Sequence, residues 1–551
     1  MRLPDFAAAE QIHDFDVAVV GGGVSGAYTA FRLRHAATEE LGPKLRARAA
    51  QRPDGKLRVG LFESSDRIGG RLFSLTLPGV SDTPVELGGM RFLNSHQRVM
   101  ALVNLFQLAY RPLPVEDPLA RHMYYLRGQH FTAADWADPA FNPPYRLERG
   151  ERARSPGSLL HEVVLRHRAA LERYPERYRD VGFWNLLLAE LSDQAYRLIR
   201  DATGYDSLVS NWSAADAIPY LIADFAPGSM YFALRKGFEE LPRELSRRFS
   251  AAGGEIRMRH RLHRVDREGE LLRLTFDVGE GTDNVRRVDA PVVCRAHHVV
   301  LAMPRRALEL LHQDSFMFDS PRFESDVTAV LPQAGFKIFA AYRRPWWKTT
   351  RGITAGRSIT DLPVRQCYYW VTGDETPGAG NPNSVLMASY NDGASVAFWA
   401  GLTRNAERYQ APPEVFPPGV AIPEDLRGAI APAPLILEMQ SQLCELHGLG
   451  VRARDGTFPA ILPYLAVFQD WTRDPFGGGW HFWKVGADSK RIARRMQRPV
   501  ADAPLYVCGE AWSHQQGWVE GALETADAVL EQELLVPTPT WIGGRGRPNG
   551  A

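Results

Sequence analysis

The chain has 551 residues, of which 45% are hydrophobic, 10% are aromatic and 23% are charged, and its formal net charge is +1. This length suits two to four structural units, and the composition is that of a globular protein with a large core. A nearly neutral charge gives no reason to expect nucleic acid or acidic membranes as partners. The four cysteines are widely spaced, so neither a zinc site nor a disulfide framework is predicted.

The first fifteen residues lack a basic region followed by an apolar core, so no secretory signal is predicted. No run approaches the roughly 20 apolar residues of a membrane helix. We therefore expect a cytoplasmic protein without a membrane partner.

Near the N-terminus, a short apolar run passes into a glycine turn and then into a helical pattern. The segment DVAVVGGGVSG carries Gly21, Gly23 and Gly26 at the spacing G-x-G-x-x-G. In a dinucleotide-binding turn the first glycine permits the bend, the second lets backbone N–H groups approach a pyrophosphate, and the third lets the helix pack on the strand. Val24 and Ser25 would begin the helix whose positive end binds a phosphate. The motif is weak alone, but its strand–turn–helix context predicts dinucleotide binding.

A second strand, LRVGLFESS, follows a polar, basic insert at about residues 34–56 and carries Glu63 and Ser64 near its end. An acidic residue at this place commonly binds the ribose hydroxyls of the adenosine half. Glu63 argues against a 2′-phosphate, for which a basic residue is expected. A solvated carboxylate at a strand end is the alternative interpretation of Glu63.

Two further glycine pairs lie downstream, each next to arginine. Glycines allow close backbone approach, and arginines supply charge for a pyrophosphate. The segments RIGGRLFS and ELGGMRF contain Arg67, Gly70, Arg71, Gly88, Gly89, Met90 and Arg91.

The order of these motifs carries a family resemblance. E-x-x-x-R-x-G-G-R begins at Glu63, E-L-G-G-M-R follows, and CGE…GWVEGA lies near the C-terminus. This order resembles the flavin-containing amine oxidase superfamily over residues 14–535 or so, and the Met-Arg pair is similar to L-amino acid oxidases rather than monoamine or polyamine oxidases. Monoamine oxidases carry a flavin-linking cysteine near the segment DWTRDPFGGGW, which has none here. The resemblance therefore implies FAD that is bound non-covalently.

The resemblance also implies an α/β fold, with a Rossmann-like FAD-binding domain, a mixed-sheet substrate domain and a helical subdomain. We expect residues 14–77, 231–325 and 499–538 in the first, 78–149 and 326–498 in the second, 150–230 in the third, and a flexible tail at 539–551. The helical pattern between Gly150 and Asp224 agrees with this division. From Tyr231 the pattern predicts a helix, a glycine stop and a strand, and from about Gln333 to Trp483 strand-like pieces dominate.

Further cofactor residues follow from the resemblance alone. A strand from Leu505 to Cys508 would lead to Gly509 and Glu510, and a final helix would open at Gly517, Trp518 and Val519. Glu510 would meet the ribityl–pyrophosphate region, and the Val519 N–H the flavin pyrimidine. Backbone at Leu262 would touch the adenine, and Trp471 belongs to the segment W-x-x-D-P-x-x-G-G.

The same resemblance implies a substrate site. Arg91 and Tyr390 would hold the α-carboxylate, because a guanidinium fork and a phenol are donors that a simple amine does not need. The faces of Trp480 and Trp518 and the Gly517 carbonyl would hold the amine. Lys337 would be linked through water to the flavin N5. By periodicity alone, Lys337 on a solvated strand face and Tyr390 as sheet packing are also compatible with the sequence.

We therefore expect an FAD-dependent L-amino acid oxidase that uses O₂ and prefers substrates with apolar, aromatic or long side chains. Substrates with Lys or Arg side chains remain an alternative, because Trp stacks on cations. Residues 201–240 contain no histidine, whereas some family members have a histidine there that has been considered as a base. Family members are often homodimers. The rival hypotheses are a monoamine or polyamine oxidase, an L-amino acid 2-monooxygenase that gives amide and carbon dioxide, and a flavin-binding scaffold without turnover.

Overall fold

A computed structural model describes residues 13–542 except 153, 225–227, 281–285, 288–290, 373–382, 405, 424 and 451–460. Of the predicted tail at 539–551, residues 543–551 lie outside the described residues. In the part of the chain so described, no helix is long and apolar enough to cross a membrane.

The largest sheet contains the glycine turn at one strand end. Its central strands are parallel and buried on both faces, as the continuous apolar run Val17–Val20 predicts. β22 (Leu505–Val507) runs parallel to the end of β14, and β13 (Arg286–Arg287) pairs with β12. The order is β10 (Glu255–Arg257), β2 (Val59–Phe62), β1 (His13–Val20), β14 (Val292–Leu301), β12 (Leu271–Glu280) and β11 (His260–Glu268).

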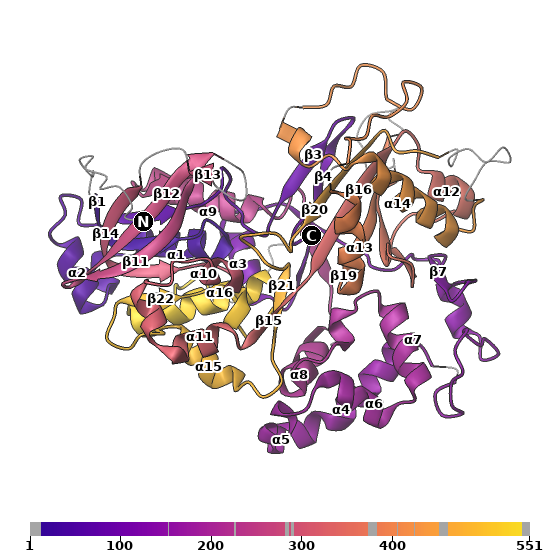
Figure 1. Cartoon of the computed structure of the whole chain (residues 1–551), viewed down its shortest axis with the longest axis horizontal. Helices are drawn as coiled ribbons and strands as arrows, with labels where there is room; N and C mark the ends of the chain where they lie inside the picture. Colours follow the sequence, from indigo (N-terminus) through magenta and orange to yellow (C-terminus); the bar gives the residue numbers. More distant parts are fainter. Residues whose placement is uncertain are drawn as a thin grey trace, which may run out of the picture.

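Helices cover both faces of this sheet (Figure 1). The apolar side chains of α1 (Val24–His35), α9 (Glu240–Ala251) and α16 (Val519–Ala528) form one core with one face. A second core on the other face includes side chains of α10 (Arg305–Glu309), α11 (Pro321–Val327) and α15 (Ser489–Met496). Helices on both faces of a mostly parallel sheet define the α/β layer that the sequence predicts.

A second, mixed sheet holds two of the predicted site residues. All eight residues of β16 (Gly335–Tyr342) are buried. In the antiparallel pair of β16 with β19 (Ser384–Asp392), Lys337 lies opposite Tyr390, so both side chains share one face. The order is β20 (Leu465–Asp470), β16, β19, β18 (Gln366–Val371), β17 (Arg357–Thr360), β7 (Met123–Leu126) and β8 (Gln129–Thr132).

The predicted helical region forms a separate group of helices, drawn in purple and magenta at the lower right of Figure 1. Leucines and aromatics at three- and four-residue spacing make its core. The group comprises α4 (Pro156–Arg173), α5 (Pro175–Arg179), α6 (Phe183–Glu190), α7 (Asp193–Thr203), η3 (Ser207–Val209) and α8 (Ala214–Asp224).

Small sheets and short helices complete the chain. The small sheets are β15 (Val330–Gln333) with β21 (Trp480–Trp483), β3 (Ser74–Leu77) with β4 (Val80–Glu86), and β5 (Phe92–Leu93) with β9 (Tyr231–Leu234) and β6 (Tyr110–Pro112). The other helices are η1 (Thr38–Glu40), α2 (Pro43–Ala49), α3 (Gln97–Leu105), η2 (Ala133–Ala137), η4 (Phe316–Asp319), α12 (Trp346–Arg351), α13 (Ala394–Leu402), η5 (Asp425–Gly428), α14 (Ala433–Leu446), η6 (Glu510–Trp512) and η7 (Val529–Glu533).

One prediction of local structure is wrong. The segment from Tyr231 begins as β9, because it pairs with both β5 and β6, and the helix begins only at Glu240. Within 333–483 the structure has the helices α12, α13 and α14, which bury apolar side chains against the mixed sheet. The strands of the large sheet lie in the ranges predicted for the FAD-binding domain, with β1 starting one residue earlier; the division into domains itself stays a prediction.

Candidate active site

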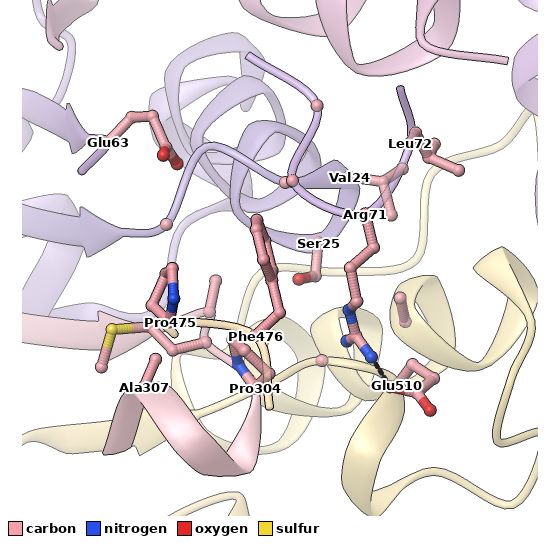
Figure 2. A pocket seen from close by; sticks show the side chains of 18 of the residues that line it. Val24, Ser25, Glu63, Arg71, Leu72, Pro304, Ala307, Pro475, Phe476 and Glu510 are labelled. Carbon is pink, nitrogen blue, oxygen red and sulfur yellow. Dashed lines mark ion pairs between the residues drawn. The ribbon is translucent and has the colours of Figure 1, made fainter. Parts of the chain in front are cut away.

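A first cavity opens at the carboxyl ends of β1, β2 and β14, beside the glycine turn (Figure 2). Both helices whose N-termini border it, α1 and α16, lack a side-chain cap, so their first N–H groups are available to an anion. The predicted residues that line it are Gly21, Gly23, Val24, Ser25, Glu63, Ser64, Gly70, Arg71, Gly89, Leu262, Gly509, Glu510, Gly517, Trp518 and Val519.

The three glycines of the turn differ in what surrounds them. A Cβ on Gly21 would lie 2.3 Å from the Ala302 carbonyl oxygen, and one on Gly26 would lie 1.9 Å from the Gly21 oxygen. A Cβ on Gly23 would meet no atom nearer than 3.9 Å, and Gly23 lines the first cavity. The chain itself therefore requires the first and third glycines, whereas the second leaves a cradle for a ligand. These residues fit a dinucleotide.

Glu63 is not a solvated carboxylate. It is only 7% exposed, and it accepts hydrogen bonds from the Gly22 N–H at 2.6 Å and from the Ser65 N–H at 2.8 Å. A carboxylate has about four acceptor sites, so acceptor capacity remains on the cavity side for a hydroxyl. The alternative of a solvated strand end is therefore wrong.

Three predicted cofactor residues lie elsewhere, namely Gly26, which contacts Gly21 closely, Arg67 and Trp471. Arg67 turns back on its own loop, where it donates to the Gly70 oxygen at 2.6 Å and to the Leu72 oxygen at 3.0 Å. Trp471 donates its indole N–H to the Leu87 oxygen at 2.8 Å and lines neither cavity described here. All three residues support the surroundings of the site, and their contact with a cofactor stays a prediction.

Arg71 and Glu510 form an ion pair of 2.8 Å across the first cavity, the dashed line in Figure 2. Glu510 also contacts the ring nitrogen Nδ1 of His481 at 3.1 Å. Burial disfavours the Glu510 carboxylate, but Arg71 and His481 outweigh burial and lower its pKa to about 2. Glu510 is therefore ionised at neutral pH.

A second cavity joins the first through Gly89, Gly517, Trp518 and Val519, which line both. The predicted residues Gly88, Met90 and Arg91 line only this one. Its lining contains two cationic side chains, Arg91 and Lys337, and no Asp or Glu. The complete set is Gly88, Gly89, Met90, Arg91, Tyr205, Ser207, Leu208, Tyr220, Phe238, Lys337, Tyr390, Trp480, Phe482, Gly517, Trp518 and Val519.

Lys337 is buried, with 3% of its surface exposed, so a place on a solvated strand face is excluded. Its Nζ donates to the Gly88 oxygen at 2.7 Å and to the Glu86 oxygen at 3.2 Å, and lies 4.4 Å from the Tyr390 ring centroid. Burial lowers the pKa of Lys337, and the neighbouring buried carboxyl of Glu86 partly opposes this shift.

Arg91 and Tyr390 reach the second cavity from different parts of the fold. The Arg91 guanidinium lies over the Tyr231 ring, 4.2 Å from its centroid. The Tyr390 ring meets the Tyr205 ring edge to face, with centroids 5.2 Å apart. A guanidinium and phenols in one cavity form a donor set suited to a carboxylate.

The helical group contributes residues to the second cavity that were not predicted from the sequence. They are Tyr205, Ser207, Leu208 and Tyr220. A sequence signal for this contribution is Gly204 at the end of α7. Its φ of +81° ends the helix one residue before Tyr205.

Arg357 was also missed. It lies behind Tyr205, 5.9 Å from that ring centroid, and donates to Gln366 at 2.6 Å. Among the residues described, no carboxylate forms an ion pair with it. It adds positive charge behind the second cavity.

No group of three or more His, Cys, Asp or Glu side chains in the described ranges could hold a metal ion. All four cysteines are buried and free, and none lines either cavity.

Known proteins resemble this chain over most of its length. It is 26% identical to Aplysianin-A of Aplysia kurodai, with 94% of this chain and 89% of that protein covered. It is 23% identical to an L-amino-acid oxidase of Siganus canaliculatus, with 93% and 83% covered. A solved structure of a putrescine oxidase variant superposes with a TM-score of 0.63 at 16% identity over 95% of this chain and 99% of that one, which shows a common fold.

The family model for flavin containing amine oxidoreductases matches residues 48–430 and 434–529. The match begins after the glycine turn, so the turn indicates a dinucleotide site independently of the family model, which adds the flavin. With its dinucleotide-binding turn, its second cavity and this match, the chain belongs to the flavin containing amine oxidoreductase family.

Proposed function

We propose that this oxidoreductase is an FAD-dependent L-amino acid oxidase, which converts an L-amino acid and O₂ to a 2-oxo acid, ammonia and hydrogen peroxide. The observation that carries the proposal is the charge of the second cavity. Its lining has Arg91 and Lys337 but no carboxylate, and phenols border the same space. A substrate carboxylate would supply the missing negative charge.

The charge of the second cavity also bears on the rival activities. A diamine would bring further positive charge beside Arg91 and Lys337, and like charges in a buried site repel strongly. The same argument disfavours substrates with Lys or Arg side chains. Aromatic lining from Tyr205, Tyr220 and Phe482 favours apolar or aromatic side chains.

In the proposed reaction, Arg91 and Tyr390 bind the α-carboxylate while the faces of Trp480 and Trp518 and the Gly517 carbonyl receive the amine. Two anchors on one small molecule fix its orientation, and orientation contributes several kcal/mol to catalysis. The amine must be neutral before the α-C–H bond breaks, and apolar surroundings lower its pKa. Either the neutral amine is selected directly, or a water near Lys337 accepts the proton.

FAD would be held non-covalently by the glycine turn, Glu63, Arg71 and the N-terminus of α16. The absence of cysteine from the lining of both cavities supports non-covalent binding. When bound, FAD supplies the oxidant that takes the hydride and passes two electrons to O₂.

The relatives agree with this proposal without deciding it. Proteins named L-amino-acid oxidase in Protobothrops flavoviridis and L-tryptophan oxidase in Lentzea aerocolonigenes are 20% and 22% identical to this chain. The likeness to putrescine oxidase concerns the fold alone.

The deciding experiment is a peroxide assay of the flavin-loaded protein with each of the twenty L-amino acids. D-Leucine, putrescine and tyramine serve as controls, and 2-oxo acid and carbon dioxide are recorded in parallel. Peroxide and 2-oxo acid from L-amino acids alone are expected. Peroxide from the amines alone would establish an amine oxidase, and carbon dioxide with amide in place of peroxide would establish a monooxygenase.

Two further properties, a homodimer and a cytoplasmic location, are also part of the proposal. Sedimentation of the flavin-loaded protein tests the first, and fractionation of the producing cells tests the second.

A further inference from the structure

We propose that Glu510 is the positioning residue of both tryptophan walls of the second cavity, with Arg71 and His481 holding its carboxylate in place. Its predicted role lies toward the cofactor. Besides Arg71, however, its carboxylate contacts His481, which follows Trp480, and Gly517, which precedes Trp518.

The Arg71–Glu510 pair holds the peptide groups on both sides of Trp480. Arg71 Nη1 donates to the carbonyl oxygen of Gly479 at 3.1 Å, just before Trp480. The N–H of His481, just after Trp480, donates to Glu510 Oε1 at 2.8 Å. One buried ion pair therefore fixes this end of β21.

The same Glu510 oxygen, Oε1, also holds the backbone next to Trp518, the other tryptophan wall. The N–H of Gly517 donates to Oε1 at 3.1 Å, directly before Trp518 at the start of α16. Gly517 has a φ of +79°, and a Cβ there would lie 3.7 Å from the Trp480 side chain. The backbone at both walls thus meets at a single carboxylate oxygen, and a shift of that oxygen moves both tryptophans.

His481 sets the orientation of the carboxylate. Its ring is fully buried, and Nδ1 lies 3.1 Å from Glu510 Oε2. Because Glu510 is ionised, Nδ1 carries the hydrogen, and Nε2 has no hydrogen-bond partner among the described residues. A proton on Nε2 would be buried without an acceptor, so the ring stays neutral. His481 therefore donates to the Glu510 carboxylate while it stays uncharged, so the negative charge of Glu510 remains available to Arg71.

The carboxylate wall of the second cavity is held by aromatic contacts. Arg91 packs on Tyr231, and Tyr390 packs on Tyr205. The Tyr231 ring also stacks on the Trp518 ring, with centroids 6.5 Å apart, so Tyr231 borders both walls. The proposal predicts that loss of the His481 ring affects the amine wall more than the carboxylate wall, because Glu510 holds the backbone next to Trp480 and Trp518. It rests on the proposed function only in assigning the tryptophans to the amine.

The test uses benzoate, a carboxylate without an amine, and benzylamine, an amine without a carboxylate, as probes of flavin absorbance in the flavin-loaded enzyme. His481→Leu removes the donor at Nδ1, and His481→Asn keeps a donor near that position. We expect His481→Leu to raise the benzylamine Kd about tenfold and the benzoate Kd less than twofold. His481→Asn should restore most of the benzylamine affinity. Arg91→Met, the reciprocal control, should weaken benzoate and spare benzylamine.

Equal loss of both probes in His481→Leu at matched flavin content would overturn the proposal, because it would mean a general structural defect. Unchanged benzylamine affinity in that variant would overturn it as well. Failure of the proposed function has a different signature. The unmodified enzyme would then bind benzylamine but not benzoate, and the effect of His481→Leu on benzylamine would still test the positioning role.

Discussion

The two cavities are built in opposite ways. The first is lined by short contiguous runs, several of which follow directly on the strands β1, β2, β14 and β22. The second is assembled from side chains of the 88–91 turn, the helical group, β16, β19, β21 and the start of α16. The comparison teaches that the first cavity is lined by short runs that sequence motifs mark, whereas the second is lined mostly by single side chains that distant segments bring together. Four predictions test that contrast.

Arg91→Met should have the largest effect. It removes charge-assisted hydrogen bonds worth about 1.5–3 kcal/mol each, so the loss of two should lower kcat/KM for L-amino acids roughly 10²–10⁴-fold. Flavin content should stay unchanged, because Arg91 lines only the second cavity. Stopped-flow flavin reduction measures the effect, with Arg91→Lys as the matched control that keeps a charge. If Arg91→Met lost its flavin instead, the two cavities would not be separable.

Because of the Glu510 ion pair, the free energy of unfolding should depend on pH in the acid range. Its pKa is lowered from 4.5 to about 2, so the ionised form is favoured by folding. The resulting stabilisation, at most about 3 kcal/mol, is present above pH 4.5 and is lost as the pH falls from 4.5 to 2. Urea unfolding across this range should show the loss. In Glu510→Gln, the free energy of unfolding should change less with pH between 4.5 and 2. An unchanged pH dependence in this variant would contradict the assignment to Glu510.

Substitutions in the glycine turn should separate effects on the stability of the protein from effects on FAD binding. Gly21→Ala forces a Cβ to 2.3 Å from a backbone oxygen, and overpacking of this kind costs about 1–3 kcal/mol, so the flavin-free protein should melt at a lower temperature. Gly23→Ala meets no atom within 3.9 Å and should leave that melting temperature unchanged. It should instead raise the FAD Kd about tenfold, equivalent to roughly 1.4 kcal/mol. Calorimetry and flavin titration distinguish the two, and equal destabilisation would refute the separate roles.

Tyr390→Phe should have the smallest effect. It removes one phenol donor, worth about 1 kcal/mol, and should raise KM for L-amino acids roughly fivefold with little change in flavin binding. Tyr205→Phe, on the neighbouring ring of the helical group, is the matched control. A larger effect for Tyr205→Phe would shift the carboxylate contact from the mixed sheet to the helical group.

The sequence was sufficient for features whose physical cause is local. The glycine spacing, the apolar β1 run and the pattern of α1 lie within a few turns of chain, and their combination predicts the α/β layer and the first cavity. The order of motifs around Glu63 and Arg91 predicted the family. Lys337 and Tyr390, which were predicted as site residues, line the second cavity, and their roles stay predictions; periodicity could not decide which face of the sheet was buried.

Only the tertiary structure decided the rest, because the causes lie between segments far apart in the chain. Tyr205 and Tyr220 become cavity residues through the packing of the helical group on the mixed sheet. The apolar side chains of α13 and α14 pack on the mixed sheet, and this contact stabilises both helices. The local sequence pattern does not reveal that contact. Glu510 joins Arg71, His481 and Gly517, at sequence separations of up to several hundred residues. A single carboxylate can position two tryptophans only where folding brings those donors to the same oxygen.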